Sequence, residues 1–523
     1  RTPILVYELG NENWGQAKTD WTPEVYGKNA EIWCRALRER FAAAQREHPQ
    51  LAGLRLHITA VGFPTMGNNQ DPLKAVDHAV NQAWVAEIKR LADLKLIDAV
   101  TDHFYPFPGN VGDGFWWVAH NLHNIFALRT GTPNERLGGY TDPTLAYGLP
   151  IEVTEWNIKC WGQNRSRTDL KLANRGFEEG LASWQVVSGK AAADPAAARR
   201  GRAGLKLLPH PDGTVVTQKV SVADRPNALA FGFFVWCRTP SPEALEISIS
   251  TDLDGTPAAA TQPADTRALA VRRASQKTMW HRLLVLHRGV QHAREIELRI
   301  ALTGPNAAET FIDEVEPLHT QAAVNMMPVA AGRYEQQLFA IDALREMLYW
   351  PVPRTHWHHL FGGYPCPQLW ADGSMRPNAA VFELVADRIG RQLVRTTVET
   401  PVFGFDSHAD EHATDFSAVT PDVTDIPALA AAATREGERE TVYLLLINRT
   451  TDRPITTSIV LPGDFELPEQ IEVRTLIGTD LDVEGARVER TTIPRDQLAR
   501  HVIAPLSAQV LCLGTPPAAR SAR

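Results

Sequence analysis

The chain has 523 residues, of which 44% are hydrophobic and 22% are charged, and its formal net charge is −8. These proportions are typical of globular proteins and exclude a disordered or collagen-like chain. Single cores stop growing beyond roughly 250–300 residues, so we expect about three domains. The negative charge is dispersed, with no run of like charge that would attract nucleic acid.

The five cysteines are also dispersed, at Cys34, Cys160, Cys237, Cys366 and Cys512. Because their number is odd and no two are close in sequence, we expect packed thiols, and neither a disulfide framework nor a paired-cysteine metal site. No run approaches the roughly 18 consecutive apolar residues that a membrane span requires. We therefore predict a soluble protein that contacts neither membrane nor nucleic acid.

The first third of the chain alternates short apolar runs with helical stretches, which is the pattern of βα units around a parallel sheet. We predict strands at residues 3–9, 54–61, 97–104 and 150–154, and helices at 23–46, 72–94 and within 116–129. The first strand follows Arg1 almost directly, so we expect the natural protein to continue upstream. For that reason the sequence does not give the compartment.

The rest of the chain is mostly β. Short alternating segments separated by Pro, Asp and Gly run from about Leu172 to Leu318 and predict an all-β module. Helical periodicity returns at residues 334–349 and 378–389, on either side of a strand-like run at 352–360. From about residue 393 strands predominate, notably at 441–446, 456–461 and 509–513, which predicts a terminal β-sandwich.

Two glutamates, Glu12 and Glu155, each end an apolar strand. In a (β/α)8 barrel the catalytic groups lie at the C-terminal ends of the strands. Strand alternation places Glu155 on one face and Glu152 and Thr154 on the other, so Glu152 is the weaker candidate. Glu8 shares a face with Glu12 and would lie deeper in the barrel, where it needs a polar partner.

A pair of carboxyl groups on either side of a glycosidic bond can carry out its hydrolysis. One attacks the anomeric carbon, while the other protonates the leaving oxygen and then activates the water that releases the sugar. The acid must hold its proton near neutrality, to which an apolar wall from Trp14 and Trp156 would contribute. His103 and Tyr105, on one face at the end of the third strand, would keep the nucleophile anionic, orient the acid or bind substrate.

Three segments, taken in order, match a known pattern. Residues 8–14, 103–105 and 154–157 resemble the fourth, sixth and seventh barrel strands of clan A glycoside hydrolases, most closely the family 51 α-L-arabinofuranosidases. That family also has a C-terminal β-sandwich, which residues 446–449 and 504–511 resemble. The resemblance covers most of the chain outside the all-β insertion.

The resemblance implies a retaining glycosidase with Glu12 as general acid/base and Glu155 as nucleophile, acting on arabinose-containing plant polysaccharides or oligosaccharides without a cofactor or metal ion. Asn11 would bind the sugar 2-hydroxyl, and Trp156 and Asn157 would shape the subsite. Strict alternation would turn Asn11 away from Glu12, so we expect the backbone to leave strand geometry there. Retention requires carboxyl groups about 5–5.5 Å apart, whereas more than roughly 6.5 Å indicates inversion.

The implied fold is α/β, a (β/α)8 TIM-type barrel whose strands 1–3 have no counterpart here, with an inserted jelly roll and a C-terminal β-sandwich. The predicted domains are residues 1–170 (barrel strands 4–7), 171–320 (jelly roll), 321–390 (barrel strand 8 and helices) and 391–523 (β-sandwich). Residues 174–178 and 311–315 resemble the edges of carbohydrate-binding modules, which favours an extracellular or periplasmic location. Trp184, Trp236 and Trp280 could stack on sugar, although packing in the core is the preferred interpretation.

Each candidate residue also has a structural interpretation. A single Glu at a strand end is usually solvated or ion-paired, and His103 and Tyr105 are as readily packed as catalytic. His356, His358 and His359 lack further ligands at metal spacing, so we expect no metal site there. Two functional alternatives remain: a clan A hydrolase of β-xylosides or β-glucans, and a non-catalytic carbohydrate-binding protein on a decayed barrel.

Overall fold

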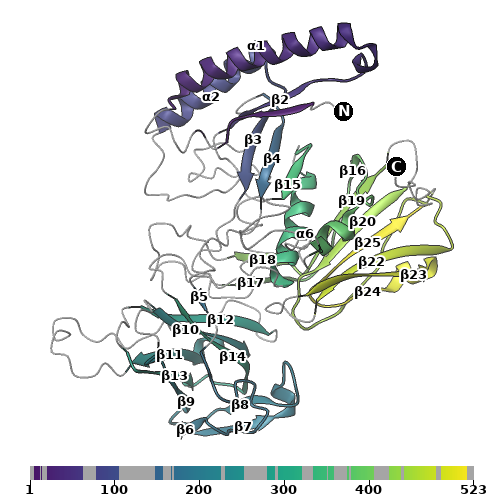
Figure 1. Ribbon diagram of the computed structural model, residues 1–523. Coiled ribbons are helices and arrows are strands. Elements are labelled where there is room, and N and C mark those ends of the chain that lie inside the picture. The colour runs from purple at the N-terminus through teal and green to yellow at the C-terminus, as the bar shows by residue number, and fades with distance from the viewer. Residues whose placement is uncertain are drawn as a thin grey trace. The chain divides into compact units, whose positions relative to one another are not determined.

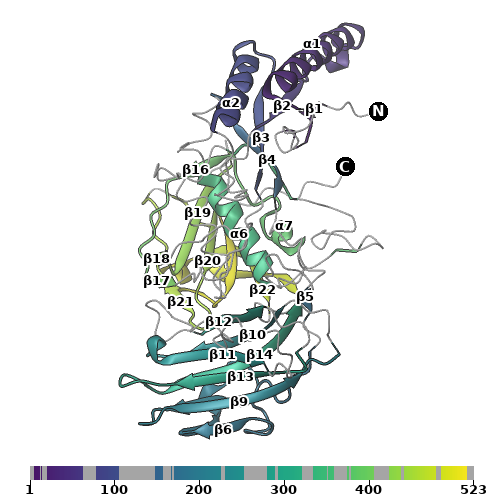
Figure 2. The same cartoon turned by 90° about the vertical axis from the view of Figure 1, so that its left-hand side faces the viewer.

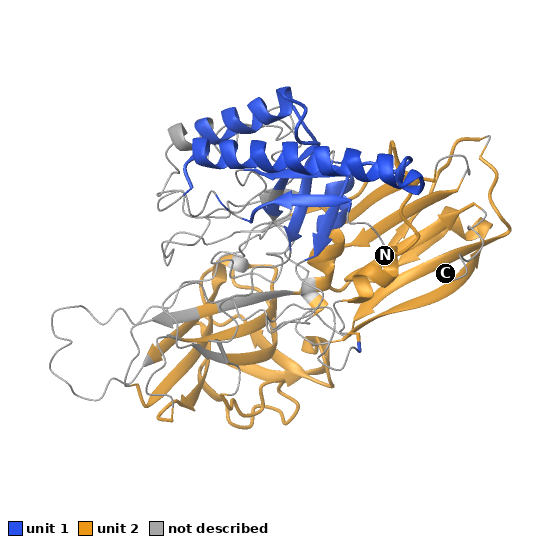
Figure 3. Ribbon diagram, turned by 45° about the horizontal axis from the view of Figure 1, so that its top comes forward, with its two compact units in different colours: residues 1–107, 120–159, 343–374 blue, residues 108–119, 160–342, 375–523 orange. Residues whose placement is uncertain are grey.

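The structure of the protein is a computed structural model. It describes residues 5–11, 13, 21–62, 78–104, 148–156, 166–167, 170–224, 230–251, 280–288, 293–320, 334–349, 352–357, 374–375, 379–405, 423–436, 441–463, 465–478 and 485–514. The chain divides into two compact units (Figure 3). Unit 1 comprises residues 1–107, 120–159 and 343–374, and unit 2 comprises the remainder. Among the described helices none is long and apolar enough to cross a membrane.

Unit 1 contains a parallel sheet of five strands in the order β1-β2-β3-β4-β15. The strands are β1 (Val6–Leu9), β2 (His57–Val61), β3 (Ala99–Phe104), β4 (Ile151–Trp156) and β15 (Thr355–Trp357). The helices α1 (Pro23–Glu47) and α2 (His78–Asp93) pack together (Figure 1), and the 3-10 turn η2 (Pro49–Leu51) follows α1. In the described part of the chain the sheet is open, with β1 and β15 at its edges, so the predicted barrel is seen as a half-barrel.

Helix α1 is hydrogen-bonded to the C-terminal ends of β1 and β2. It begins after Thr22, whose side chain caps the helix by accepting from the backbone N–H of Val25. On its buried face, the Tyr26 hydroxyl donates to the Leu9 carbonyl at 3.0 Å and accepts from the Val61 N–H at 2.7 Å. The C-terminal ends of β1 and β2, where the predicted site lies, are therefore fixed from the helix side.

The β-rich segment that follows β4 forms two antiparallel sheets (Figure 2). One has the order β12-β10-β14-β8-β7 with β5 beside β14, and the other has the order β11-β13-β9-β6. The strands are β5 (Ser166–Arg167), β6 (Gln185–Ser188), β7 (Lys190–Asp194), β8 (Gly204–Leu208), β9 (Thr214–Ser221), β10 (Ala230–Arg238), β11 (Leu245–Thr251), β12 (His281–Arg288), β13 (Glu295–Leu302) and β14 (Thr310–Thr320), with 3-10 turns η7 (Pro195–Ala197) and η8 (Pro242–Ala244).

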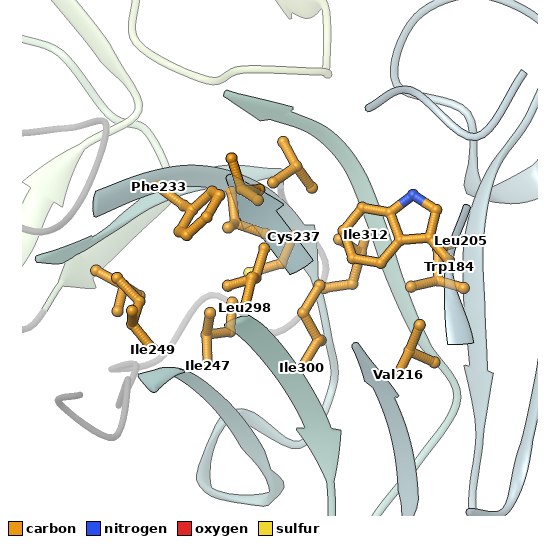
Figure 4. Packing of buried hydrophobic residues seen from close by; sticks show 14 of the residues in the cluster. Trp184, Leu205, Val216, Phe233, Cys237, Ile247, Ile249, Leu298, Ile300 and Ile312 are labelled. Atoms are coloured by element: carbon orange, nitrogen blue, oxygen red, sulfur yellow. The ribbon is translucent and has the colours of Figure 1, made fainter. Parts of the chain in front are cut away.

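Alternate residues of both sheets meet in one apolar core (Figure 4). Phe233 and Cys237 from β10 pack with Ile247 from β11 and Leu298 and Ile300 from β13, and all five are fully buried. This arrangement follows from the period of two along a strand, which sends every second side chain to the same face.

The three tryptophans of this segment are buried. Trp184, Trp236 and Trp280 are 6%, 0% and 4% exposed. Trp184 packs on Phe177 with ring centroids 4.9 Å apart, and the guanidinium of Arg199 lies 3.4 Å from the centroid of Trp236. The core interpretation of these residues is confirmed, and none of them offers an open ring face to a sugar.

The C-terminal part is an antiparallel sheet in the order β16-β19-β20-β25-β22-β23, with two ribbons, β17-β18 and β21-β24. The strands are β16 (Gln392–Val394), β17 (Val402–Phe405), β18 (Val423–Pro427), β19 (Leu429–Arg435), β20 (Val442–Asn448), β21 (Ile455–Thr457), β22 (Gln470–Gly478), β23 (Ala486–Pro494), β24 (His501–Ile503) and β25 (Ser507–Leu513), with the 3-10 helix η11 (Arg495–Arg500). Leu444, Val473 and Leu511 of the sheet share a core with Ile503 of a ribbon and Leu498 of η11.

Two helices precede this sheet. Helix α6 (Tyr334–Tyr349) has the predicted bounds, whereas α7 (Ala380–Val385) is shorter than the predicted 378–389 because Ala386 leaves helical geometry with a ψ of 128° and Asp387 has a φ of +53°. Cys34, Cys237 and Cys512 are buried free thiols, as expected. Cys160, Cys366 and the helix predicted within 116–129 lie outside the described residues.

Candidate active site

The C-terminal ends of β3 and β4 bring His103 and Glu155 together. The two residues are register partners, and Nδ1 of His103 lies 3.5 Å from Oε2 of Glu155. The His103 side chain is 5% exposed and that of Glu155 is 25% exposed. A packed imidazole therefore contacts a carboxylate that is partly exposed to solvent.

Strand β4 carries an extra residue at this point. Asp102 and His103 are consecutive in β3, yet their partners in β4 are Val153 and Glu155, two positions apart. The pairing of β4 with β15 shifts register at the same place. Both neighbours thus show a β-bulge in β4 around Thr154, a feature that re-aims side chains and is frequent next to active sites.

The bulge overturns the alternation expected for β4. The Thr154 hydroxyl donates to Oε1 of Glu8 at 3.3 Å, and Glu155 contacts His103, whose Nε2 lies 4.0 Å from the same oxygen. Two consecutive side chains of β4 therefore reach one cluster, which a regular strand does not allow. The prediction that Thr154 points away from the face of Glu155 is wrong for this reason.

Glu152 lies in a closed ionic cluster. Its side chain is 2% exposed, and its Oε1 lies 3.0 Å from Nε2 of His57 and 3.6 Å from Nε of Arg354. A carboxylate held in this way is paired within the sheet and cannot reach a substrate. This agrees with its ranking below Glu155.

Glu8 has polar partners, as we expected for a glutamate at this position in the barrel. Its side chain is 29% exposed and accepts hydrogen bonds from Thr101 and Thr154. Partial removal from water raises the pKa of the Glu8 carboxyl, and the nearby Glu155 raises it further. The two hydrogen bonds and His103 act in the opposite direction. Glu8 is therefore a member of the same electrostatic cluster as Glu155.

The backbone leaves strand geometry directly after Leu9. Gly10 has a φ of +109°, and a side chain there would collide with Oδ1 of Asn13, which is buried. Asn11 follows in a bend and is exposed. The expected departure from strand geometry near Asn11 is therefore present. It occurs at Gly10, because glycine adopts a positive φ readily.

Four of the predicted site residues, Glu12, Trp14, Tyr105 and Asn157, lie outside the described residues. Their roles, and the separation of the two proposed catalytic carboxyl groups, stay predictions. Trp156 is described: it is fully buried and meets Trp357 edge-on, with ring centroids 4.8 Å apart. It contributes a packed wall beside Glu155 and no open stacking surface.

Sequence reasoning missed Thr101 and Thr154 as members of the cluster. Threonine is an ordinary residue in strands, and only the bulge in β4 turns Thr154 toward Glu8. Within the part of the chain that the structure describes, no group of three or more His, Cys, Asp or Glu side chains is arranged to hold a metal ion.

Neither a protein-family model nor a curated protein matches the chain. Among solved structures, the α-L-arabinofuranosidase of Thermotoga maritima in an arabinose complex has a TM-score of 0.44 at 13% identity, covering 97% of this chain and 65% of that one. The family 51 enzyme of Thermotoga petrophila RKU-1 has a TM-score of 0.40 at 13% identity, with the same coverage. The chain thus spans about two thirds of these proteins.

Smaller solved domains match part of the chain. The xylan-binding domain CBM22-1 of Paenibacillus barcinonensis Xyn10C has 16% identity and a TM-score of 0.22, and the match covers 28% of this chain and 93% of that domain. Family 51 α-L-arabinofuranosidases and carbohydrate-binding modules, the two groups that the sequence resembles, are therefore among the structural neighbours.

Proposed function

We propose that the protein is a retaining glycoside hydrolase of the α-L-arabinofuranosidase type, acting on arabinose-containing plant polysaccharides or oligosaccharides. The observation that carries the proposal is Glu155: a carboxylate at the C-terminal end of a parallel strand, 25% exposed, with a packed imidazole at 3.5 Å. Catalytic groups of barrel enzymes occupy this end of the sheet. The order of the three sequence motifs supports the same assignment.

The proposed reaction has two displacements. Glu155 attacks the anomeric carbon, the bond to the leaving oxygen breaks, and Glu12 protonates that oxygen. Glu12 then removes a proton from water, which attacks the anomeric carbon and releases Glu155. The His103 ring aims the Glu155 carboxylate, and Asn11 binds the sugar 2-hydroxyl. Trp14, Tyr105, Trp156 and Asn157 shape the surrounding subsite.

The test is a panel of nitrophenyl glycosides on the 523-residue chain, followed by NMR of the product before it mutarotates. We expect hydrolysis of the α-L-arabinofuranoside with retained anomeric configuration. Preferential hydrolysis of a β-xyloside would favour the related clan A alternative. An inverted product would contradict the two-displacement mechanism, and binding of oligosaccharide without turnover would favour the non-catalytic alternative.

A further inference from the structure

We propose that Glu8 is a positioning residue, which aims Glu155 through two contacts, one with Thr154 and one with His103. This inference deepens the proposed function, and it rests on that function for the reaction that Glu155 would perform. Glu8 itself lies one position before Leu9, at the end of β1, and would not touch the reacting atoms.

The first contact fixes the bulge. The Thr154 hydroxyl donates to Oε1 of Glu8 at 3.3 Å, and Thr154 directly precedes Glu155 in the irregular part of β4. A β-bulge lacks the regular ladder hydrogen bonds that hold a strand residue in place. The bond from β4 to β1, which spans the positions of β2 and β3, replaces part of that restraint and holds the backbone from which Glu155 projects.

The second contact places an imidazole between two carboxylates. Nδ1 of His103 faces Oε2 of Glu155 at 3.5 Å, and Nε2 of the same ring faces Oε1 of Glu8 at 4.0 Å. The hydrogen-bond partner of one ring nitrogen of a histidine determines whether the other nitrogen carries a proton. A ring that carries a proton on both nitrogens presents one N–H to Glu8 and the other to Glu155. The ring is 5% exposed, so water competes little for either side.

The charged and titratable groups around Glu8 come from three elements. His103 lies on β3, Glu155 lies on β4, and the Tyr26 phenol lies on α1. Glu8 and Glu155 repel each other, and this repulsion contributes to the raised pKa of Glu8. Both carboxylates face the same His103 ring, so a change at Glu8 alters the surroundings of Glu155.

The first arm of the test needs no substrate. Glu8→Gln, Glu155→Gln and the double variant are compared with the parent chain in thermal unfolding at neutral pH. We expect the midpoint shift of the double variant to be less stabilising than the sum of the single shifts, because either glutamine alone already relieves the repulsion. Additive shifts would overturn the inference.

The second arm measures turnover of the nitrophenyl arabinofuranoside. Thr154→Val removes the hydroxyl with little change in shape, and we expect kcat to fall by about tenfold to a hundredfold with KM little changed, since small misplacements cost rates of this order. Thr59→Val is the matched control, because Thr59 is a buried threonine of β2 and the register partner of Glu8, but its hydroxyl donates to the Tyr7 carbonyl at 3.3 Å. It should keep the kcat of the parent chain.

Glu8→Gln keeps an acceptor for Thr154 and removes the charge. We expect the acid limb of its kcat/KM profile to move to lower pH, because the neutral glutamine no longer repels a negative charge on Glu155. Unchanged kcat in Thr154→Val together with an unmoved limb in Glu8→Gln would overturn the inference. Absence of turnover in the parent chain would instead overturn the proposed function, and the unfolding cycle would still decide whether Glu8 and Glu155 are coupled.

Discussion

Asp342 on α6 and Arg449 at the end of β20 form a bidentate ion pair, with Nε to Oδ2 at 3.0 Å and Nη2 to Oδ1 at 2.8 Å. Their side chains are 0% and 1% exposed. The remaining Nη1 of Arg449 donates to the Pro427 carbonyl at 3.2 Å. Two parallel hydrogen bonds of this kind are among the strongest polar contacts in proteins, and they link Asp342 to the C-terminal sheet within unit 2.

Removal of one partner from this pair should be costly. Asp342→Ala leaves a buried guanidinium without its counter-charge, and we expect the free energy of unfolding to fall by about 3–5 kcal/mol. Chemical denaturation of the purified chain measures this loss. The double variant Asp342→Leu/Arg449→Met should be more stable than Asp342→Ala, because no unpaired charge remains. The reverse order would contradict the account.

Glu155→Gln should abolish turnover while leaving the fold intact. We expect kcat to fall by about three orders of magnitude or more, because the amide cannot form the covalent intermediate. The matched control is Glu152→Gln in the same strand, whose carboxylate is 2% exposed and paired with His57. It should lower the unfolding midpoint and affect kcat far less. Equal losses of kcat in the two variants would remove the distinction between them.

Gly10→Ala should disturb the segment that presents Asn11. The φ of +109° is unfavourable for any residue with a side chain, and the new methyl group would collide with Asn13. We expect a stability loss of about 1–3 kcal/mol and a loss of turnover. Gly53→Ala is the control, because nothing lies within 4 Å of a side chain added there. Kinetics and denaturation of both variants decide the point.

Asp313 should make stability depend on pH in the acid range. Its side chain is fully buried, and burial raises the pKa to about 6, although the N–H groups of Arg199, Arg200 and Glu314 oppose the shift. The folded chain thus holds this proton more tightly than the unfolded chain, whose aspartate titrates near 3.8. The stabilisation is complete below that pH and is lost as the pH rises through about 6.

Denaturation at a series of pH values measures this dependence. Asp313→Asn stays neutral, so the part of the decline between pH 3.8 and about 6 that Asp313 causes should disappear in this variant. Asp194→Asn is the contrasting control, because the Ala196 N–H lowers the pKa of the partly exposed Asp194 carboxyl. Asp194→Asn should therefore keep the fall in stability between pH 3.8 and about 6. If the parent chain itself showed no such fall, ionisation of Asp313 would not destabilise the fold.

The alternation and helical periodicity of the sequence predicted α6 over its full length and the order of the parallel strands along the chain. These features are local, because the face on which a side chain lies depends only on its position within a repeat of two residues in a strand or 3.6 residues in a helix. The sequence also predicted that Glu155 lies near a strand end. It further predicted irregular backbone before Glu12, and Gly10 has the positive φ that makes the backbone irregular.

Only the tertiary structure decided which side chains meet. The bulge in β4 depends on the hydrogen-bond registers of β3 and β15, which come from distant parts of the chain, so no repeat in residues 150–156 reveals it. The Thr154 contact with Glu8 is one consequence, and it contradicts strict alternation. The Asp342 pair with Arg449 likewise joins residues 107 positions apart. Periodicity determines the face of each residue within an element, whereas register and packing between elements determine its partners.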